Sequence, residues 1–125
     1  MGGEQSQYSI GLEKTPANFV ALTPLSFLAR TAAIYPDHTS AVYEGRVFTW
    51  SQTYARCRRF ASYLGRRNIG PGDTVAAMLP NIPAMNEVHF AIPMAGAVLN
   101  ALNIRLDAAS IAFQLDHGGA GIILV

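Results

Sequence analysis

Lysine is nearly absent from this sequence. Lys14 is the one lysine among 125 residues, and the other eight of its nine basic residues are arginines. Lysine ammonium groups commonly stabilise the negative charge that develops on a phosphate or carboxylate during catalysis. Because residues 23–125 contain no lysine, that part of the chain cannot by itself carry out a reaction that requires one.

The sequence also has little cysteine, no long apolar run and a small net charge. The single cysteine, Cys57, excludes an internal disulfide framework and fits a reducing compartment, so we expect a cytoplasmic location. No run approaches the roughly 18 apolar residues of a membrane-spanning helix, and the N-terminus lacks the pattern of a secretory signal. The net charge of +1 implies no strong attraction to nucleic acid or to an anionic membrane.

The composition is nevertheless that of a folded domain. Half of the residues are hydrophobic and 14% are charged, which is enough apolar material for a core and argues against disorder. Residues 1–22 are polar at first and show no sustained period, so we read them as a leader. We therefore place the folded domain at residues 23–125, a length that suits one domain.

The first part of this domain predicts a helix followed by a hairpin. Thr23-Pro24 combines a cap residue with proline at the first helical position, and Pro36-Asp37 ends the helix. The Glu44-Gly45 pair then separates two short strands, 40–43 and 46–49, which predicts an antiparallel β-hairpin.

A long helix follows, capped by Thr49 or Ser51 and ending within residues 68–72. Helical spacing gives it one apolar stripe, with Phe60 beside it. Several arginines share part of the remaining surface. A nucleic-acid site would also require an overall basic field, so we interpret them as a solvated face and expect no nucleic-acid partner. The stripe consists of Trp50, Tyr54, Cys57, Ala61 and Leu64, and the arginines are Arg56, Arg58, Arg59, Arg66 and Arg67.

The second part alternates strands with helices. Apolar strands are predicted at residues 74–79, 97–102 and 121–125, and helices at 83–96 and 107–118. Strand, helix, strand, helix, strand implies parallel crossovers. The fold class is therefore α/β, with a β-hairpin followed by a βαβαβ unit of parallel strands.

Two features suggest a piece of a larger protein. The helix at 83–96 is apolar on two opposite sides, which is typical of a helix buried from both sides, and this short chain offers few partners for the second side. The sequence also ends within an apolar strand, at residues 122–125. Proteins normally cover or protect the free edge of such a strand.

The residues by themselves give no reaction. The glycines at 70–72 and 118–119 precede strands, whereas a phosphate loop precedes a helix, and we expect Asp73 to fix the turn before its strand. The three histidines have no metal-like spacing. His89 is best read as a buried, hydrogen-bonded side chain, with a pocket wall as the sharper alternative.

The order of motifs resembles a known family. "FTWSQTYARCRRFASYL", "GPGDTVAAMLPNIPAMNEVHFAIPMAGAVLNALNIRL" and "IAFQLDHGGAGIILV" resemble the N-terminal part of AMP-forming acyl-CoA synthetases of the adenylate-forming superfamily. The stretch "TPANFVALTPLSFLARTAAIYPD", at residues 15–37, is most similar to the plant-type acyl-activating enzymes and their bacterial relatives. Residues 23–125 would then be the truncated start of the large N-terminal, AMP-binding domain.

The resemblance implies a ligase that uses ATP, Mg²⁺ and CoA. In this family a carboxylate attacks ATP to form an acyl-adenylate, and CoA then displaces AMP to form a thioester, as in fatty acid metabolism. The family's phosphate loop, nucleotide contacts and adenylation lysine match no position here, so we expect no catalytic, cofactor-binding or metal-binding residue in this segment. Pro80-Asn81 and "LNIRL" resemble the family's strand-to-helix turns, with Ile104 where proline is more common.

The resemblance suggests residues that could contact the substrate, and it leaves open two functions other than that of a ligase. Met85, His89 and Met94 are candidates for the wall of an acyl pocket, which would suit an apolar, fatty carboxylic acid. One alternative is a stand-alone, non-catalytic module that pairs with a partner chain or with itself. The other is a small independent nucleotide-binding protein, since parallel strands alone do not fix a function.

Overall fold

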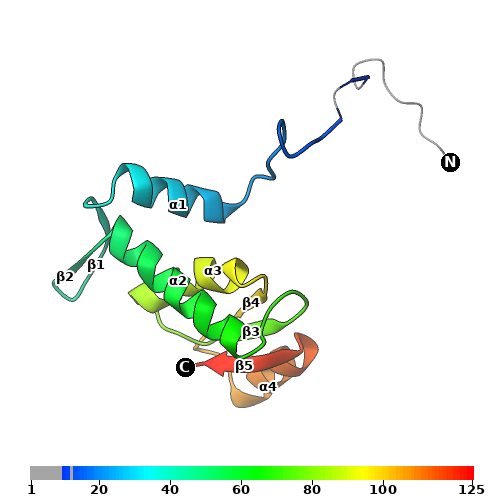
Figure 1. The fold of residues 1–125 in the computed structure, drawn as a ribbon. Helices are drawn as coiled ribbons and strands as arrows, with labels where there is room; N and C mark the ends of the chain where they lie inside the picture. The colour runs from blue at the N-terminus through cyan, green and yellow to red at the C-terminus, as the bar shows by residue number, and fades with distance from the viewer. Residues whose placement is uncertain (1–9, 12) are drawn as a thin grey trace.

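A computed structural model describes residues 10–11 and 13–125. Residues 1–9 and 12 of the expected leader therefore lie outside the described residues. Residues 13–22 contain no helix or strand and run away from the rest of the domain (Figure 1). Lys14 lies in this segment with its Nζ 4.4 Å from the centre of the Phe19 ring.

The first two helices begin where their cap residues predict. Helix α1 (Pro24–Ile34) starts after Thr23, whose Oγ1 accepts a hydrogen bond from the Leu25 N–H at 3.0 Å. Helix α2 (Trp50–Arg66) starts after Thr49, which forms a reciprocal capping box with Gln52. Thr49, rather than Ser51, is thus the cap.

The hairpin joins strands β1 (Thr39–Tyr43) and β2 (Arg46–Thr49) in antiparallel pairing. Glu44 and Gly45 both have positive φ angles, 47° and 75°, the combination that a two-residue turn of a right-twisted hairpin requires. The register shifts around Ser40, whose hydroxyl bonds to the Phe48 and Thr49 carbonyls and to Thr53 Oγ1.

Three parallel strands form the second sheet, in the order β4-β3-β5. Helices α3 and α4 connect them in chain order (Figure 1). The predicted α/β class is confirmed. The strands are β3 (Thr74–Ala77), β4 (Val98–Ala101) and β5 (Ala120–Leu124), and the helices are α3 (Pro83–Met94) and α4 (Ala108–His117).

Two strands are shorter than the sequence predicted. Strand β3 stops before Pro80, which has no N–H to extend the ladder, although the Met78 N–H still donates to Leu124 O. Strand β4 begins after Ala97, because the Ala97 N–H donates back to Ile92 O at the end of α3 and Gly96 has a φ of 84°.

Helix α3 lies between two hydrophobic clusters. Val88 and Ile92 pack toward the parallel sheet with Val75 and Ala77. Ala91 packs on the other side, against α1 and α2, in a cluster that also contains Leu28, Cys57, Phe90 and Met94. Burial from both sides is therefore confirmed, but our expectation that this chain offers few partners for the second side was wrong. Helices α1 and α2 supply that cover (Figure 1).

Helix α4 is attached more loosely. Asp107 caps it as predicted, with Oδ1 accepting from the Ser110 N–H at 3.0 Å, and this backbone hydrogen bond lowers the pKa of the Asp107 carboxyl. None of the helix residues is buried. The hydrogen bond from Asn100 Nδ2 to Gln114 O links it to the sheet, and the Phe113 ring is mostly exposed.

Candidate functional site

The loops that follow β3 and β4 meet at the carboxyl edge of the sheet, where open α/β folds bind their ligands. They enclose a hollow of about 330 Å³. Its polar groups are the side chains of Asn81, Asn103 and Arg105, and Met85 of α3 closes one side. The sheet therefore presents a small, partly polar hollow at the edge where a site is expected.

Backbone hydrogen bonds hold both loops in place. The Leu102 N–H donates to Ala77 O at 2.9 Å, so the β4 loop leaves the sheet directly beside β3. Asn103 Oδ1 then accepts from the Arg105 N–H at 2.9 Å, which closes a turn of the type that asparagine favours. The predicted strand-to-helix turns are confirmed, and the second forms with Ile104 in its centre.

A second, larger groove adjoins this hollow. It has a volume of about 660 Å³ and lies between strand β1 and the first two turns of α3. Residues 40–43 line one wall, and Met85, His89 and Phe90 line the other. Met85 borders both hollows. At the far end, a hydrogen bond with Glu44 raises the pKa of the Tyr43 phenol, which favours its protonated form.

The structure brings two of the three candidate wall residues together. His89 Nδ1 lies 2.7 Å from Met85 O; because a carbonyl only accepts, Nδ1 carries the proton in this hydrogen bond. The hydrogen bond that we expected is present, but His89 is exposed rather than buried. Met94 packs with the cluster between α1, α2 and α3 instead. It follows Met85 by nine residues, which places it on the opposite side of a helix.

This arrangement offers shape and hydrogen bonds without reactive groups. Within residues 10–11 and 13–125, no three His, Cys, Asp or Glu side chains lie close enough to share a metal ion. Cys57 is fully buried, and burial raises the pKa of its thiol to about 11, so it is not a nucleophile. Asp73 Oδ2 accepts from the Gly70 N–H at 2.8 Å. The glycine turn is therefore closed by a carboxylate, as predicted for Asp73, and would repel a phosphate.

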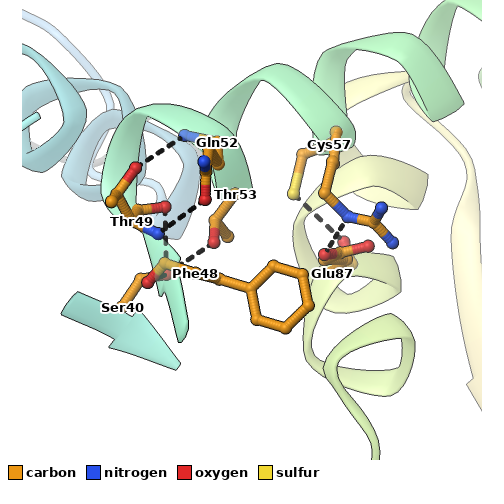
Figure 2. A network of polar contacts seen from close by, with 8 residues as sticks. Ser40, Phe48, Thr49, Gln52, Thr53, Cys57 and Glu87 are labelled. Carbon is orange, nitrogen blue, oxygen red and sulfur yellow. Dashed lines mark hydrogen bonds and ion pairs between the residues drawn. The ribbon is translucent and has the colours of Figure 1, made fainter. Parts of the chain in front are cut away.

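Sequence reasoning missed the polar network that joins the hairpin, α2 and α3 (Figure 2). Thr53 is buried and contacts Ser40, at 2.6 Å between their hydroxyl oxygens. Glu87 is buried and bonds to Arg56, so Arg56 does not belong to the solvated arginine face. Arg58, Arg59, Arg66 and Arg67 are exposed, as expected. One signal existed in the sequence, because Glu87 is the lone carboxylate in an apolar helix and needs a cation.

Among the described residues, no helix is both long and apolar enough to cross a membrane.

The sequence pattern of the family described as AMP-binding enzyme matches residues 28–125. A peroxisomal acetate/butyrate–CoA ligase of Arabidopsis thaliana is 56% identical over 114 residues, and a peroxisomal trans-cinnamate:CoA ligase of Petunia hybrida is 52% identical over the same length. Each match covers 91% of this chain and 20% of the relative. The chain thus spans about a fifth of the length of the curated relatives it matches.

A solved structure agrees with these matches. The o-succinylbenzoate CoA synthetase of Bacillus subtilis, in complex with its acyl-adenylate intermediate, superimposes with a TM-score of 0.73 at 28% identity. The superposition covers 78% of this chain and 26% of that one. The predicted fold, a hairpin and a βαβαβ unit that begin the large domain of such enzymes, is therefore confirmed.

Proposed function

The chain belongs to the AMP-binding enzyme family, and on this premise we propose that it is the N-terminal portion of an ATP-dependent carboxylate–CoA ligase. The observation that carries the proposal is the 56% identity over 114 residues to an acetate/butyrate–CoA ligase. The whole enzyme would join a carboxylate to AMP with release of pyrophosphate, and CoA would then displace AMP to give the thioester. Residues 1–22 would form a leader and residues 23–125 the start of the AMP-binding domain.

We propose that the family's cofactors bind outside this segment. The one lysine, Lys14, lies over the Phe19 ring in the segment before α1, and the glycines at 70–72 lead into a strand. We therefore assign ATP, Mg²⁺ and CoA to the longer enzyme and none of them to this segment. The 125-residue chain tested alone should form neither adenylate nor thioester.

We further propose that Met85 and His89 form part of the acyl-pocket wall. Both line the groove beside β1, and Met85 also reaches the hollow at the carboxyl edge of the sheet. Met94 would support this wall from behind, through the core cluster around Ala91. Apolar and polar residues line this groove in similar numbers, and the apolar ones would contact the chain of an apolar carboxylic acid.

The test uses a longer reading frame that contains this segment. Thioester formation is measured across carboxylic acids of increasing length, for the unaltered enzyme and for His89→Ala. His117→Ala, at the far end of α4, is the matched control. We expect His89→Ala to change the ratio of kcat/KM between short and long acids by roughly tenfold, and His117→Ala to leave it unchanged. An unchanged ratio in both would remove His89 from the pocket wall.

The second candidate function is a non-catalytic module that pairs with a partner chain or with itself. Exposed apolar side chains on the sheet and α4 favour it, because a partner chain could bury them. They are Val98, Phe113 and Ile123. The intact mass of the native protein in its source cells separates the two functions. A mass several times 13.4 kDa supports the ligase, and a mass of 13.4 kDa supports the module.

We propose the cytoplasm as the compartment, on the basis of the single cysteine, which is free and buried. Several relatives are described as peroxisomal, so organelle fractionation is the direct test. Recovery of the protein with peroxisomes would overturn this assignment.

A further inference from the structure

A groove lined by arginines lies between strand β2 and helix α2, outside the candidate acyl site. Its volume is about 920 Å³. Five of the eight arginines in the sequence border it, one from β2 and four from α2, and no carboxylate is among its lining residues. They are Arg46, Arg56, Arg58, Arg59 and Arg66.

The positive charge of this groove is largely uncompensated. Within the described part of the chain, Arg56 is the one arginine with a carboxylate within 4.0 Å, and that partner is Glu87. Arg66 donates to a neutral hydroxyl, Ser62 Oγ, at 2.9 Å. Arg46, Arg59 and Arg66 are exposed. A chain with a net charge of only +1 therefore concentrates positive charge in one place.

The polar residues of α2 in this groove form an elongated stripe. Gln52, Arg56, Arg59 and Arg66 follow spacings of four, three and seven residues, which place them along one side of α2. At 1.5 Å per residue, the stripe from Gln52 to Arg66 is about 21 Å long. An extended anionic ligand fits this stripe better than a compact ion does.

The opposite wall is the outer edge of β2. Among the residues that the structure describes, this strand pairs with β1 alone, so its second edge carries unpaired backbone groups. Three consecutive residues, 46–48, line the groove. Successive side chains of a strand point to opposite faces of the sheet. A groove that runs along one face would therefore contact every second residue. Because this groove contacts three residues in a row, it runs along the edge of β2. Val47 adds an apolar side chain that is 58% exposed.

We propose that this groove docks an extended acidic segment of a partner protein. The segment would pair with the free edge of β2, as in β-strand addition, and its carboxylates would meet Arg46, Arg59 and Arg66, since arginine forms bidentate bonds with carboxylates. The proposal does not depend on the ligase function.

Two observations favour a peptide of another protein over other anions. The Phe48 ring has Arg46 and Arg56 at 5.3 and 5.8 Å from its centre, so it is not free to stack on a nucleic-acid base. A second copy of this chain offers no acidic run, because its eight carboxylate side chains are never closer than seven positions apart in the sequence.

The test is fluorescence anisotropy with the full chain and a labelled peptide of alternating glutamate and valine. A peptide with lysine in place of glutamate is the ligand control. The double variant Arg59→Gln/Arg66→Gln removes two exposed charges of the groove, and Arg30→Gln, which removes an exposed charge of α1 outside the groove, is the protein control. We expect the double variant to weaken binding at least tenfold, Arg30→Gln to leave it unchanged, and the lysine peptide not to bind.

Three results would overturn the proposal. One is equal weakening by Arg30→Gln, which would indicate non-specific charge attraction. Another is unchanged affinity for the same acidic peptide with alternate backbone nitrogens methylated, since strand addition requires those N–H groups. The third is tighter binding of single-stranded DNA or of anionic lipid vesicles, sensitive to the double variant, which would reassign the groove to a nucleic acid or a membrane.

Discussion

Arg56 of α2 and Glu87 of α3 form a salt bridge between residues 31 positions apart in the sequence. The adjacent Cys57 thiol donates to the backbone carbonyl of the same glutamate at 3.5 Å (Figure 2). The hydrogen bond to Glu87 raises the pKa of the Arg56 guanidinium. Neighbouring residues of α2 thus bind both the side chain and the main chain of Glu87, which fixes how the two helices align.

Removing the two partners of this salt bridge should have unequal costs. The Glu87 side chain is 11% exposed and that of Arg56 is 41% exposed. Arg56→Gln leaves a nearly buried carboxylate without its cation, so we expect a loss of about 1–3 kcal/mol in the free energy of unfolding. Glu87→Gln leaves an arginine that can turn toward water, and its cost should stay below about 1 kcal/mol. Urea unfolding of both variants measures the difference, and equal costs would contradict it.

The buried thiol of Cys57 should make the protein less stable at high pH. Burial, and secondarily the charge of Glu87, raises the pKa of Cys57 to about 11, whereas an exposed thiol ionises near 8.5. Between these values the folded state holds a proton that the unfolded state has lost, so stability falls as pH rises. At about 1.4 kcal/mol per pKa unit, this group should account for a loss of about 2–3 kcal/mol between pH 8 and pH 11.

Cys57→Ala isolates this contribution. The variant is less stable at pH 8 because it leaves a small cavity, but its unfolding free energy should decline less steeply toward pH 11 than that of the unaltered chain. Urea unfolding across the pH range gives both slopes. Parallel slopes would show that other groups cause the alkaline decline.

Helix α2 should depend on the hydroxyl of Thr49. Its Oγ1 accepts from the Gln52 N–H at 3.3 Å, and the Gln52 side chain accepts from the Thr49 N–H at 3.1 Å. Thr49→Ala removes the first bond and should cost about 1 kcal/mol. Thr49→Ser keeps the hydroxyl and should cost much less. Ser51→Ala is the control, because Ser51 touches Thr49 without capping the helix, and a larger effect of Ser51→Ala would reverse the assignment.

Gly96 should tolerate a side chain less well than Gly72. Both have positive φ angles, 84° and 93°, so alanine at either position adds backbone strain of roughly 1–2 kcal/mol. A Cβ at Gly72 would meet nothing within 4 Å, whereas a Cβ at Gly96 would lie 3.0 Å from Pro71 Cγ. We therefore expect Gly96→Ala to lower the free energy of unfolding by more than Gly72→Ala does. Adding Pro71→Ala to the Gly96 variant should recover part of the difference, and no recovery would exclude the contact with Pro71 as its cause.

The sequence by itself determined the order and type of the elements. Caps and turns act over a few residues, so Thr23, Asp107 and the Glu44-Gly45 pair marked their positions without reference to the rest of the fold. Alternation of apolar strands with helices gave the α/β class, and the ordered motifs indicated the family. The opposite placement of Met85 and Met94 also follows from helical geometry alone.

The tertiary structure decided which surfaces meet. Apolar periodicity shows that a helix face is buried but not what covers it, so the packing of α1 and α2 on the second side of α3 was not predictable. The exposure of His89 depends on where β1 lies relative to α3, and the pairing of Arg56 with Glu87 depends on how α2 crosses α3. These contacts join residues that are distant in the sequence, and their geometry is set only when the chain is packed.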